Sequence, residues 1–157
     1  MRNARESDLD GIVALCAEHA EYEHASFDPD AARQNLGRFL FAGQPRAWCI
    51  VAEVGGELAG YAAYSLEFST WRAAEYLHMD CLFVRAAHRN GGLGRLLLDA
   101  IIEVATAHGC ASIEWQTPAW NTDAIRFYDR LGAIGSPKVR YRLATDRSVR
   151  ATHGGAV

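Results

Sequence analysis

The feature that most constrains the fold is an apolar run followed by a glycine-rich turn and a long amphipathic segment. The turn and the segment read RNGGLGRLLLDAIIEVA over residues 89–105, shortly after the run EYLHMDCLFV over residues 75–84. We predict a strand over the run and a helix over residues 92–107, which the pair His108-Gly109 ends. A further apolar run, ASIEWQ, follows at residues 111–116. Because a helix separates the two strands, we expect them to be parallel with a right-handed crossover, which places the chain in the α/β class.

The chain before this region predicts two helices and a β-hairpin. Ser7 or Asp8 can cap a helix that runs to about His19, and a second helix follows Pro29. The stretch AWCIVAEVGGELAGYAAYSLEF holds two apolar runs joined at the pair Gly55-Gly56, which is typical of a hairpin. The N-terminal half therefore supplies two helices and two antiparallel strands.

The chain after this region predicts one more helix and a closing strand. The helix covers residues 121–131, where Gly132 ends it, and the strand covers residues 139–143. The sequence has no internal repeat and no low-complexity linker. We therefore expect a single domain over residues 1–157 that ends in a flexible tail at residues 146–157.

Charge and cysteine usage disfavour several classes of protein. The formal net charge of −3 argues against a nucleic-acid binder, whose phosphate contacts need a basic face. The start MRNARESDLDGIVAL lacks a signal-peptide pattern, and no apolar segment reaches the length of a membrane span. The four cysteines lie apart, without metal-ligand spacing. We expect a cytoplasmic protein with reduced thiols and with no nucleic-acid, membrane or metal partner.

The glycine-rich turn has the properties of an anion-binding site. A strand that stops and a helix that starts leave free backbone N–H groups beside the positive end of a helix dipole of about half a charge. Gly91, Gly92 and Gly94 let the main chain approach a ligand closely, and Arg89 and Arg95 can reach its oxygens. A turn that only caps the helix is the alternative.

Two nucleotide-binding classes fit this turn poorly. A P-loop requires Lys-Ser or Lys-Thr after the last glycine, whereas Arg-Leu follows Gly94. A dinucleotide fold matches G-x-G over residues 92–94 and finds Glu114 at a suitable distance, but Leu97 stands where a third small residue is needed. No second βαβ half remains in the chain, so both classes are disfavoured.

Two stretches resemble the signatures of one enzyme superfamily. VRAAHRNGGLG resembles the acetyl-CoA signature R-x-x-G-x-G of the GNAT superfamily of N-acetyltransferases, matched by Arg89, Gly92 and Gly94. WNTDAIRFYDRLGA, residues 120–133, resembles the second signature, in which an Asn opens a helix and a Tyr lies one turn before a terminal Leu-Gly. The order of elements is also similar over about residues 1–145. The pattern is closest to the spermidine/spermine group, with its diamine and thialysine enzymes.

The resemblance implies a fold and an assembly. GNAT proteins have a mixed α/β (α+β) sheet of about six to seven strands flanked by about four helices. Two splayed parallel strands form the acetyl-CoA cleft, and here they would be the strand that ends at Val84 and the strand over residues 112–116. A homodimer is expected from the resemblance alone.

The resemblance also implies that acetyl-CoA is the co-substrate and which residues hold it. The glycine-rich turn would bind the pyrophosphate, and the backbone of the strand before it would pair with the pantetheine arm like an added strand. Asn121 would hydrogen-bond an amide of that arm, and Tyr128 would protonate the departing sulfur. The expected cofactor contacts are Leu82, Phe83, Val84, Arg89, Asn90, Gly91, Gly92, Leu93, Gly94, Arg95, Asn121 and Tyr128.

An amine acceptor must lose a proton, because an alkyl amine with a pKa of about 10 arrives protonated at neutral pH. Asp80 is the candidate base, since a Glu stands at this place in the resembling enzymes. The shorter Asp is compatible with a water relay, and a carboxylate that only orients the substrate is the alternative. Cys81 replaces the acid that follows in those enzymes. It suggests an acyl-cysteine route, but no His–Asp pair is placed to activate it.

The acidic stretch AEHAEYEHASFDPD, residues 17–30, lies where this superfamily folds its first helices over the acceptor. Tyr22, Glu23 and Trp71 resemble positions in the polyamine and thialysine enzymes. By that resemblance, Glu23 and Asp80 would face the substrate ammonium, and Trp71 would add an aromatic wall that favours a cation. A solvated acidic helix face is the alternative.

We therefore expect an acyltransferase that uses acetyl-CoA to acetylate a primary amine of a small cationic substrate, such as a polyamine or a thialysine-like amine, by direct transfer. Within the enzyme class, an antibiotic amine or a peptide or protein amine is the alternative. Outside it, the alternative is a non-catalytic domain that senses acyl-CoA. Such a domain should have lost its acid or its glycine loop.

Overall fold

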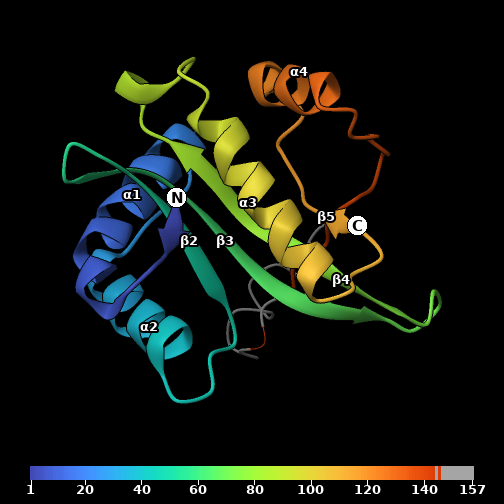
Figure 1. The fold of residues 1–157 in the computed structure, drawn as a ribbon, viewed down its shortest axis with the longest axis horizontal. Coiled ribbons are helices and arrows are strands. Elements are labelled where there is room, and N and C mark those ends of the chain that lie inside the picture. Colours follow the sequence, from blue (N-terminus) through green and yellow to red (C-terminus); the bar gives the residue numbers. More distant parts are fainter. Residues whose placement is uncertain (144, 146–157) are drawn as a thin grey trace, which may run out of the picture. The chain divides into compact units, whose positions relative to one another are not determined.

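The computed structural model describes residues 1–143 and 145, and the chain divides into two compact units, Met1–Pro118 and Ala119 onward. The first unit is drawn from blue to orange in Figure 1. It holds β1 (Arg2–Asn3), η1 (Glu6–Asp8), α1 (Leu9–Tyr22), α2 (Pro29–Phe41), β2 (Trp48–Val54), β3 (Glu57–Ser69), β4 (Ala74–Val84), η2 (Ala86–His88), α3 (Leu93–Ala107) and β5 (Ile113–Glu114). The second unit holds α4 (Thr122–Arg130). The expected single domain stays a prediction.

The sheet of the first unit has the strand order β1-β2-β3-β4-β5. The first four strands are antiparallel and β5 is parallel to β4, as the sequence predicts. The hairpin between β2 and β3 turns on Gly55 and Gly56, whose φ angles of 61° and 86° suit a tight primed turn that most other residues enter only with strain. The local chemistry of this turn sets the register of β2 against β3 next to the turn.

The strand count departs from the expected six to seven, because residues 1–143 and 145 contain five strands. The predicted strand over residues 139–143 is wrong: Val139, Tyr141 and Leu143 alternate as in a strand but have no regular structure and are at least 75% exposed. Alternation favours a strand only where a partner strand and a buried face are available. Strand β1 went unpredicted because its two residues are polar.

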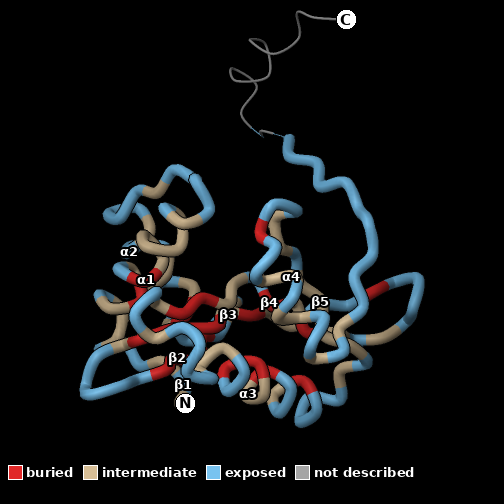
Figure 2. Tube along the Cα trace, turned by 90° about the horizontal axis from the view of Figure 1, so that it is seen from above, coloured by how far each residue is buried: buried red, intermediate tan, exposed pale blue. Residues whose placement is uncertain are grey.

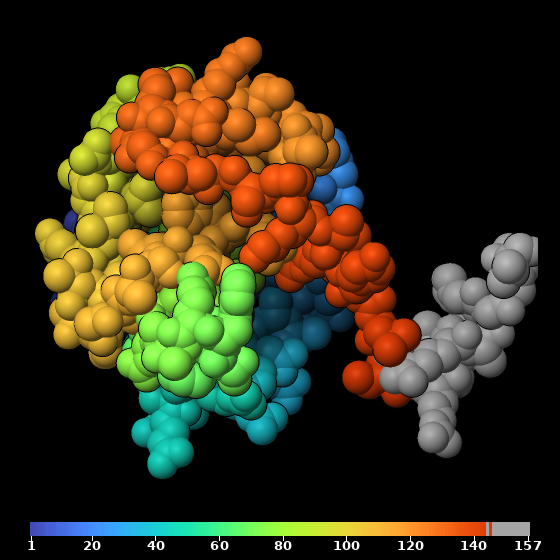
Figure 3. Space-filling view, turned by 90° about the vertical axis from the view of Figure 1, so that its right-hand side faces the viewer, coloured from blue at the N-terminus to red at the C-terminus, as the bar shows by residue number. Residues whose placement is uncertain are grey.

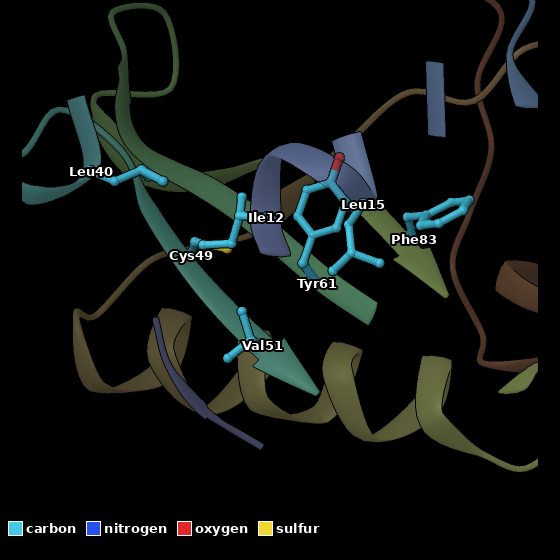
Figure 4. Close-up of a cluster of buried hydrophobic side chains, with 7 residues drawn as sticks. All are labelled: Ile12, Leu15, Leu40, Cys49, Val51, Tyr61 and Phe83. Carbon is cyan, nitrogen blue, oxygen red and sulfur yellow. The ribbon is translucent and has the colours of Figure 1, made fainter. Parts of the chain in front are cut away.

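Helices cover both faces of the sheet. Helices α1 and α2 pack on one face and α3 packs on the other (Figures 1 and 2). Under α1 and α2 lies a buried cluster (Figure 4) of Ile12, Leu15, Leu40, Cys49, Val51, Tyr61 and Phe83. On α3 the buried positions are Leu97, Leu98, Ile101 and Ala105, which recur at helical spacing toward β2, β3 and β4. The packed helices fix the ends of β3 and β4, where the candidate site lies.

The predicted end of α1 and its predicted cap both need correction. The helix runs to Tyr22 rather than to about His19, so Glu23 occupies its C-cap position. Asp8 occupies the N-terminal cap position, but its carboxylate makes no capping bond to the helix. It instead binds the Arg2 guanidinium at 2.6 Å and the Arg5 N–H at 2.7 Å. The bond to Arg2 is the largest cause of a lowered Asp8 pKa.

Candidate functional site

The edge of β4 that faces β5 is open over its second half. Parallel pairing joins Leu77 to Ile113 and His78 to Glu114, and within the described residues it goes no further. From Met79 to Val84, β4 is therefore paired only with β3 on its other side. Unpaired backbone groups on a strand edge are a template for another extended chain. The parallel pair is thus confirmed, and beyond it no strand of the described residues pairs with this edge of β4 at Leu82, Phe83 and Val84.

A β-bulge at Asp80 shapes this part of β4. Cys81 pairs with Ala63 and Met79 pairs with Tyr64, so Asp80 is an extra residue with no partner on β3. A bulge disrupts the ladder and redirects side chains. Asp80 is exposed, and the Cys81 Sγ lies 3.5 Å from its Oδ2, so both side chains stand on the same face of the sheet as α1.

Cys81 is poorly suited to be a nucleophile. Burial raises the pKa of its thiol, and the Asp80 carboxylate raises it further. A thiol attacks as its thiolate, so both influences oppose nucleophilic attack. The nearby Tyr61 hydroxyl lowers the pKa of the thiol by less than burial raises it. The geometry agrees with a cysteine that packs against the sheet.

The glycine-rich turn positions free N–H groups at the start of α3. Asn90 and Gly92 have left-handed backbones with φ of 62° and 85°, and Gly92 caps the helix. The first helical bond joins the Leu96 N–H to the Gly92 carbonyl at 3.1 Å, so helix geometry leaves the earlier N–H groups without an intrahelical acceptor. The space around the missing Cβ of Gly92 is open. The turn can therefore hold an anion through its backbone.

The two arginines predicted to reach an anion are engaged within the protein. The Arg89 Nε donates to the Val84 carbonyl at 2.9 Å, and the guanidinium stacks 4.6 Å from the Tyr22 ring centre and 5.5 Å from that of Phe83. Arg95 forms an ion pair with Asp99 at 2.8 Å. The backbone of the turn remains as the main anion contact, and side-chain contacts from these arginines stay predictions.

His19 lies at the centre of a polar cluster that the sequence did not reveal. Its ring stacks on Phe83, with centroids 5.0 Å apart, and only 16% of its side chain is exposed. Nδ1 lies 3.1 Å from the Tyr61 hydroxyl and Nε2 lies 3.4 Å from the Glu23 carboxylate. The sole signal in the sequence is the four-residue spacing of His19 and Glu23 on one helix.

Two acids of the predicted acceptor region have partners on the protein. Glu18 pairs with Arg85 at 2.9 Å, and Glu23 pairs with His19. Tyr22 lies under the Arg89 guanidinium. These contacts tie the end of α1 to the segment that follows β4. The predicted roles of Tyr22 and Glu23 toward a substrate stay predictions.

The structure separates Trp71 from the other predicted acceptor residues of the first unit. Trp71 lies in the turn between β3 and β4, with 86% of its surface exposed, and this turn stands out at the surface in light green in Figure 3. From Ala74 to Asp80 the chain advances about 20 Å at the usual rise per strand residue. Asp80, Cys81, Glu23 and Tyr22 come together near α1, whereas Trp71 does not join them within one chain.

The second unit carries the two residues of the second signature. Asn121 is buried and caps α4, where its Oδ1 accepts from the Ala124 N–H at 3.2 Å. Tyr128 lies two turns further along the helix, its ring 5.2 Å from that of Phe127. Leu131 and Gly132 end the helix, Gly132 with a φ of 82°. The predicted helix and its cap are confirmed, and the catalytic role of Tyr128 stays a prediction.

Across residues 1–143 and 145, no group of three or more His, Cys, Asp or Glu side chains is placed to hold a metal ion. Within the same residues, no helix has the length and apolar character needed to cross a membrane.

Comparison with known proteins places these features in a family. A model described as the acetyltransferase (GNAT) family matches residues 12–133. The chain is 30% identical over 141 residues to a thialysine N-epsilon-acetyltransferase of Bos taurus, an alignment that covers 85% of this chain and 82% of that protein.

Solved structures share the fold at lower identity. A possible acetyltransferase from Clostridium difficile 630 superposes with a TM-score of 0.80 at 21% identity, covering 93% of this chain and 97% of that one. An aminoglycoside N-acetyltransferase in complex with CoA superposes with a TM-score of 0.78 at 18% identity, covering 92% of this chain and 93% of that one.

Proposed function

Because the chain belongs to the acetyltransferase (GNAT) family and is an acyltransferase, we propose that it transfers the acetyl group of acetyl-CoA directly to a primary amine of a small cationic molecule. One observation carries the proposal. The open edge of β4 leads from the exposed Asp80 carboxylate into the glycine-rich turn, so an acid–base group and an anion cradle lie on one continuous stretch of chain.

The residues of the first unit fit the co-substrate. The edge of β4 at Leu82, Phe83 and Val84 has no partner strand on the β5 side, so its backbone groups suit the amides of the pantetheine arm, apart from the Val84 carbonyl that accepts from Arg89. The N–H groups at the start of α3 suit the pyrophosphate, because they are unpaired by helix geometry and Gly92 leaves open space beside them. When bound, acetyl-CoA supplies an acyl group activated as a thioester. Asn121 is proposed to hydrogen-bond an amide of the pantetheine arm, the role that the resemblance implies for it.

Asp80 is proposed to accept the proton of the acceptor. An alkyl amine with a pKa of about 10 is almost entirely protonated at neutral pH and cannot attack until it loses a proton. The bulge sets the Asp80 carboxylate at the surface beside the open edge, where an ammonium has access to it. Tyr128 is proposed to donate a proton to the departing sulfur.

The end of α1 is proposed to favour a cationic acceptor. Glu21 and Glu23 are exposed at this end, and the neighbouring Tyr22 ring already receives the Arg89 cation on its face. The similarity to a thialysine acetyltransferase supports an acceptor with a primary amine on a short flexible chain. We therefore propose a thialysine-like amine or a polyamine as the substrate class.

The direct test is the release of free thiol from acetyl-CoA with a panel of thialysine, lysine, ornithine, spermidine, an aminoglycoside and a short peptide. We expect turnover with a small amine and a loss of about 10²-fold or more in Tyr128→Phe. Tyr141→Phe is the matched control, because Tyr141 is 89% exposed outside any helix or strand. Acetyl-CoA binding without turnover on any amine would favour a sensing domain instead.

A homodimer and a cytoplasmic location also belong to the proposal. The resemblance to GNAT enzymes supports the homodimer, and the four free cysteines suit a reducing compartment such as the cytoplasm. Light scattering at several protein concentrations would show whether two copies associate.

A further inference from the structure

A polar chain crosses the space between α1 and the bulge of β4. It begins at the Asp80 carboxylate, which the Cys81 thiol contacts at 3.5 Å. The thiol is also within hydrogen-bond reach of the Tyr61 hydroxyl, and that hydroxyl lies 3.1 Å from Nδ1 of His19. Glu23 closes the chain 3.4 Å from Nε2. Five side chains from α1, β3 and β4 therefore form a continuous line.

The inner members of this chain keep their protons. Burial is the largest cause that raises the pKa values of Tyr61 and Cys81, so both groups stay neutral across the physiological range. Tyr61 is 2% exposed and stands beside Phe83 beneath α1 (Figure 4). A neutral phenol next to a ring nitrogen donates its hydrogen to Nδ1, which leaves the Nε2–H to face the Glu23 carboxylate. The two contacts thus favour the tautomer of His19 that carries its hydrogen on Nε2.

Burial favours the neutral form of His19, and two nearby carboxylates assist its protonation. Burial, the largest cause, lowers its pKa below the ordinary value, and the nearby Arg89 lowers it further. Glu23 and Asp80 act in the opposite direction and stabilise the protonated ring. Two thiols also lie near the Tyr61 hydroxyl that contacts the ring. They belong to Cys16 on α1 and Cys81 on β4. The ring therefore has an open proton site on Nδ1 and a carboxylate ready to stabilise its charge.

We propose that His19 receives the proton that Asp80 takes from the acceptor ammonium, a role that rests on the proposed acetylation of an amine. The N–H bond of the ammonium breaks, its electron pair stays on nitrogen, and the proton passes to Asp80. The Cys81 thiol and the Tyr61 hydroxyl each accept one proton and give up another, so that both end unchanged. Asp80 returns to a carboxylate, and His19 ends as an imidazolium paired with Glu23.

The charges around the ring favour this direction of transfer. An imidazole is intrinsically more basic than a carboxylate, and the Glu23 and Asp80 carboxylates stabilise the protonated ring against the opposing effect of burial. Because Asp80 would otherwise keep the proton, an acceptor behind it returns Asp80 to the carboxylate form that can take the proton of the next ammonium. In this role His19 acts on the substrate only through Tyr61, Cys81 and Asp80.

The test is the pH dependence of kcat/KM for the best amine, measured from about pH 6 to pH 10 in wild type and His19→Asn. The Asn amide oxygen can still accept from Tyr61, but the side chain cannot bind a proton. We expect the variant to be about 10- to 100-fold slower near pH 7, within the range of general-base effects. The deficit should shrink at least severalfold by about pH 10, because the amine then arrives largely deprotonated.

His108→Asn is the matched control, since His108 is exposed at the far end of α3 and should leave the profile unchanged. A deficit in His19→Asn that is constant with pH, or no deficit, would overturn the relay. Turnover by wild type in that case would leave the proposed function intact. No wild-type turnover with any amine would overturn both.

A readout without turnover separates the relay from a packing role. NMR titration of the His19 ring in the free protein should give a pKa below about 6.5, and Glu23→Gln should lower it further. Asp80→Asn should lower it as well, because the Asp80 carboxylate also stabilises the imidazolium. A His19 pKa that is the same in wild type, Glu23→Gln and Asp80→Asn would overturn the proposed relay.

Discussion

Gly60 offers a sharp test of the idea that the end of β4 holds the co-substrate. It pairs with Val84 across the β3–β4 ladder, and a Cβ built on it would lie 2.6 Å from the Phe83 carbonyl oxygen and 3.3 Å from the Val84 Cα. Non-bonded atoms essentially never come closer than 3.0 Å to a Cβ. In Gly60→Ala, the backbone of β4 must therefore move by at least about 0.4 Å, because a close-packed strand cannot absorb the methyl group otherwise.

This displacement should affect both stability and co-substrate binding. Overpacking typically costs about 1–3 kcal/mol in the free energy of unfolding, and we expect Gly60→Ala to lie in that range. The same shift moves the backbone of Phe83 and Val84, which we propose to pair with the pantetheine arm. The KM for acetyl-CoA should therefore rise by about 10-fold, which corresponds to about 1.4 kcal/mol, while the KM for the amine changes little.

The assay compares urea unfolding with initial rates at varied acetyl-CoA and at varied amine. Gly43→Ala is the matched control, because Gly43 has no positive φ and no atom within 4 Å of an added Cβ. Gly43→Ala should change neither the free energy of unfolding nor the KM for acetyl-CoA. Gly60→Ala with an unchanged KM for acetyl-CoA, in spite of a measured loss of stability, would refute the placement of the co-substrate along β4.

Three further predictions concern charges. Asp80→Asn should lower kcat/KM for the amine about 10²- to 10³-fold at neutral pH, while Glu75→Gln, on the same strand, should not; equal rates for the two variants would contradict a proton acceptor at the bulge. Because burial lowers the folded-state pKa of His19, the unfolded chain binds more protons just below pH 6.5, so stability should fall as pH drops from about 6.5 through the lowered pKa. The free energy of unfolding of His19→Asn should depend less steeply on pH in that window. A slope equal to that of wild type would contradict a lowered His19 pKa. Arg2→Gln should cost about 1 kcal/mol through loss of the partly buried pair with Asp8. That contribution should be present above about pH 4 and vanish as the pH falls through the lowered Asp8 pKa, and a cost that persists at lower pH would contradict it.

Elements governed by local chemistry were predictable from the sequence. The pair Gly55-Gly56 specifies a tight hairpin because both positions need positive φ. Gly109 ends α3 in a left-handed conformation with φ of 68°, and Asn121 caps α4 through its own side chain. In each case the residue that sets the boundary lies at the boundary, so no distant contact is needed.

Features that depend on pairing between distant segments were not predictable. The bulge at Asp80 has no local signature, because it arises from the register of β3 against β4. His19 becomes a candidate only when α1 settles on Tyr61 and Phe83. The strand predicted over residues 139–143 is absent because alternating apolar residues form a strand only when a partner strand is available.

The distribution of the predicted acceptor residues shows the same limit. Sequence similarity to positions in related enzymes grouped Trp71 with Tyr22 and Glu23. The structure puts Trp71 on the exposed turn between β3 and β4 and puts the other two at the end of α1. Similar position in a motif therefore predicts residue type better than it predicts proximity within one chain.

The most direct test of the central claim is the mass of the amine after incubation with acetyl-CoA and the protein. The proposed direct transfer predicts that the small amine gains one acetyl group, that free thiol appears in equal amount, and that the protein itself carries no acetyl group at Cys81. A protein that binds acetyl-CoA but leaves every amine unmodified, or one that accumulates an acetyl group on Cys81, would contradict the account.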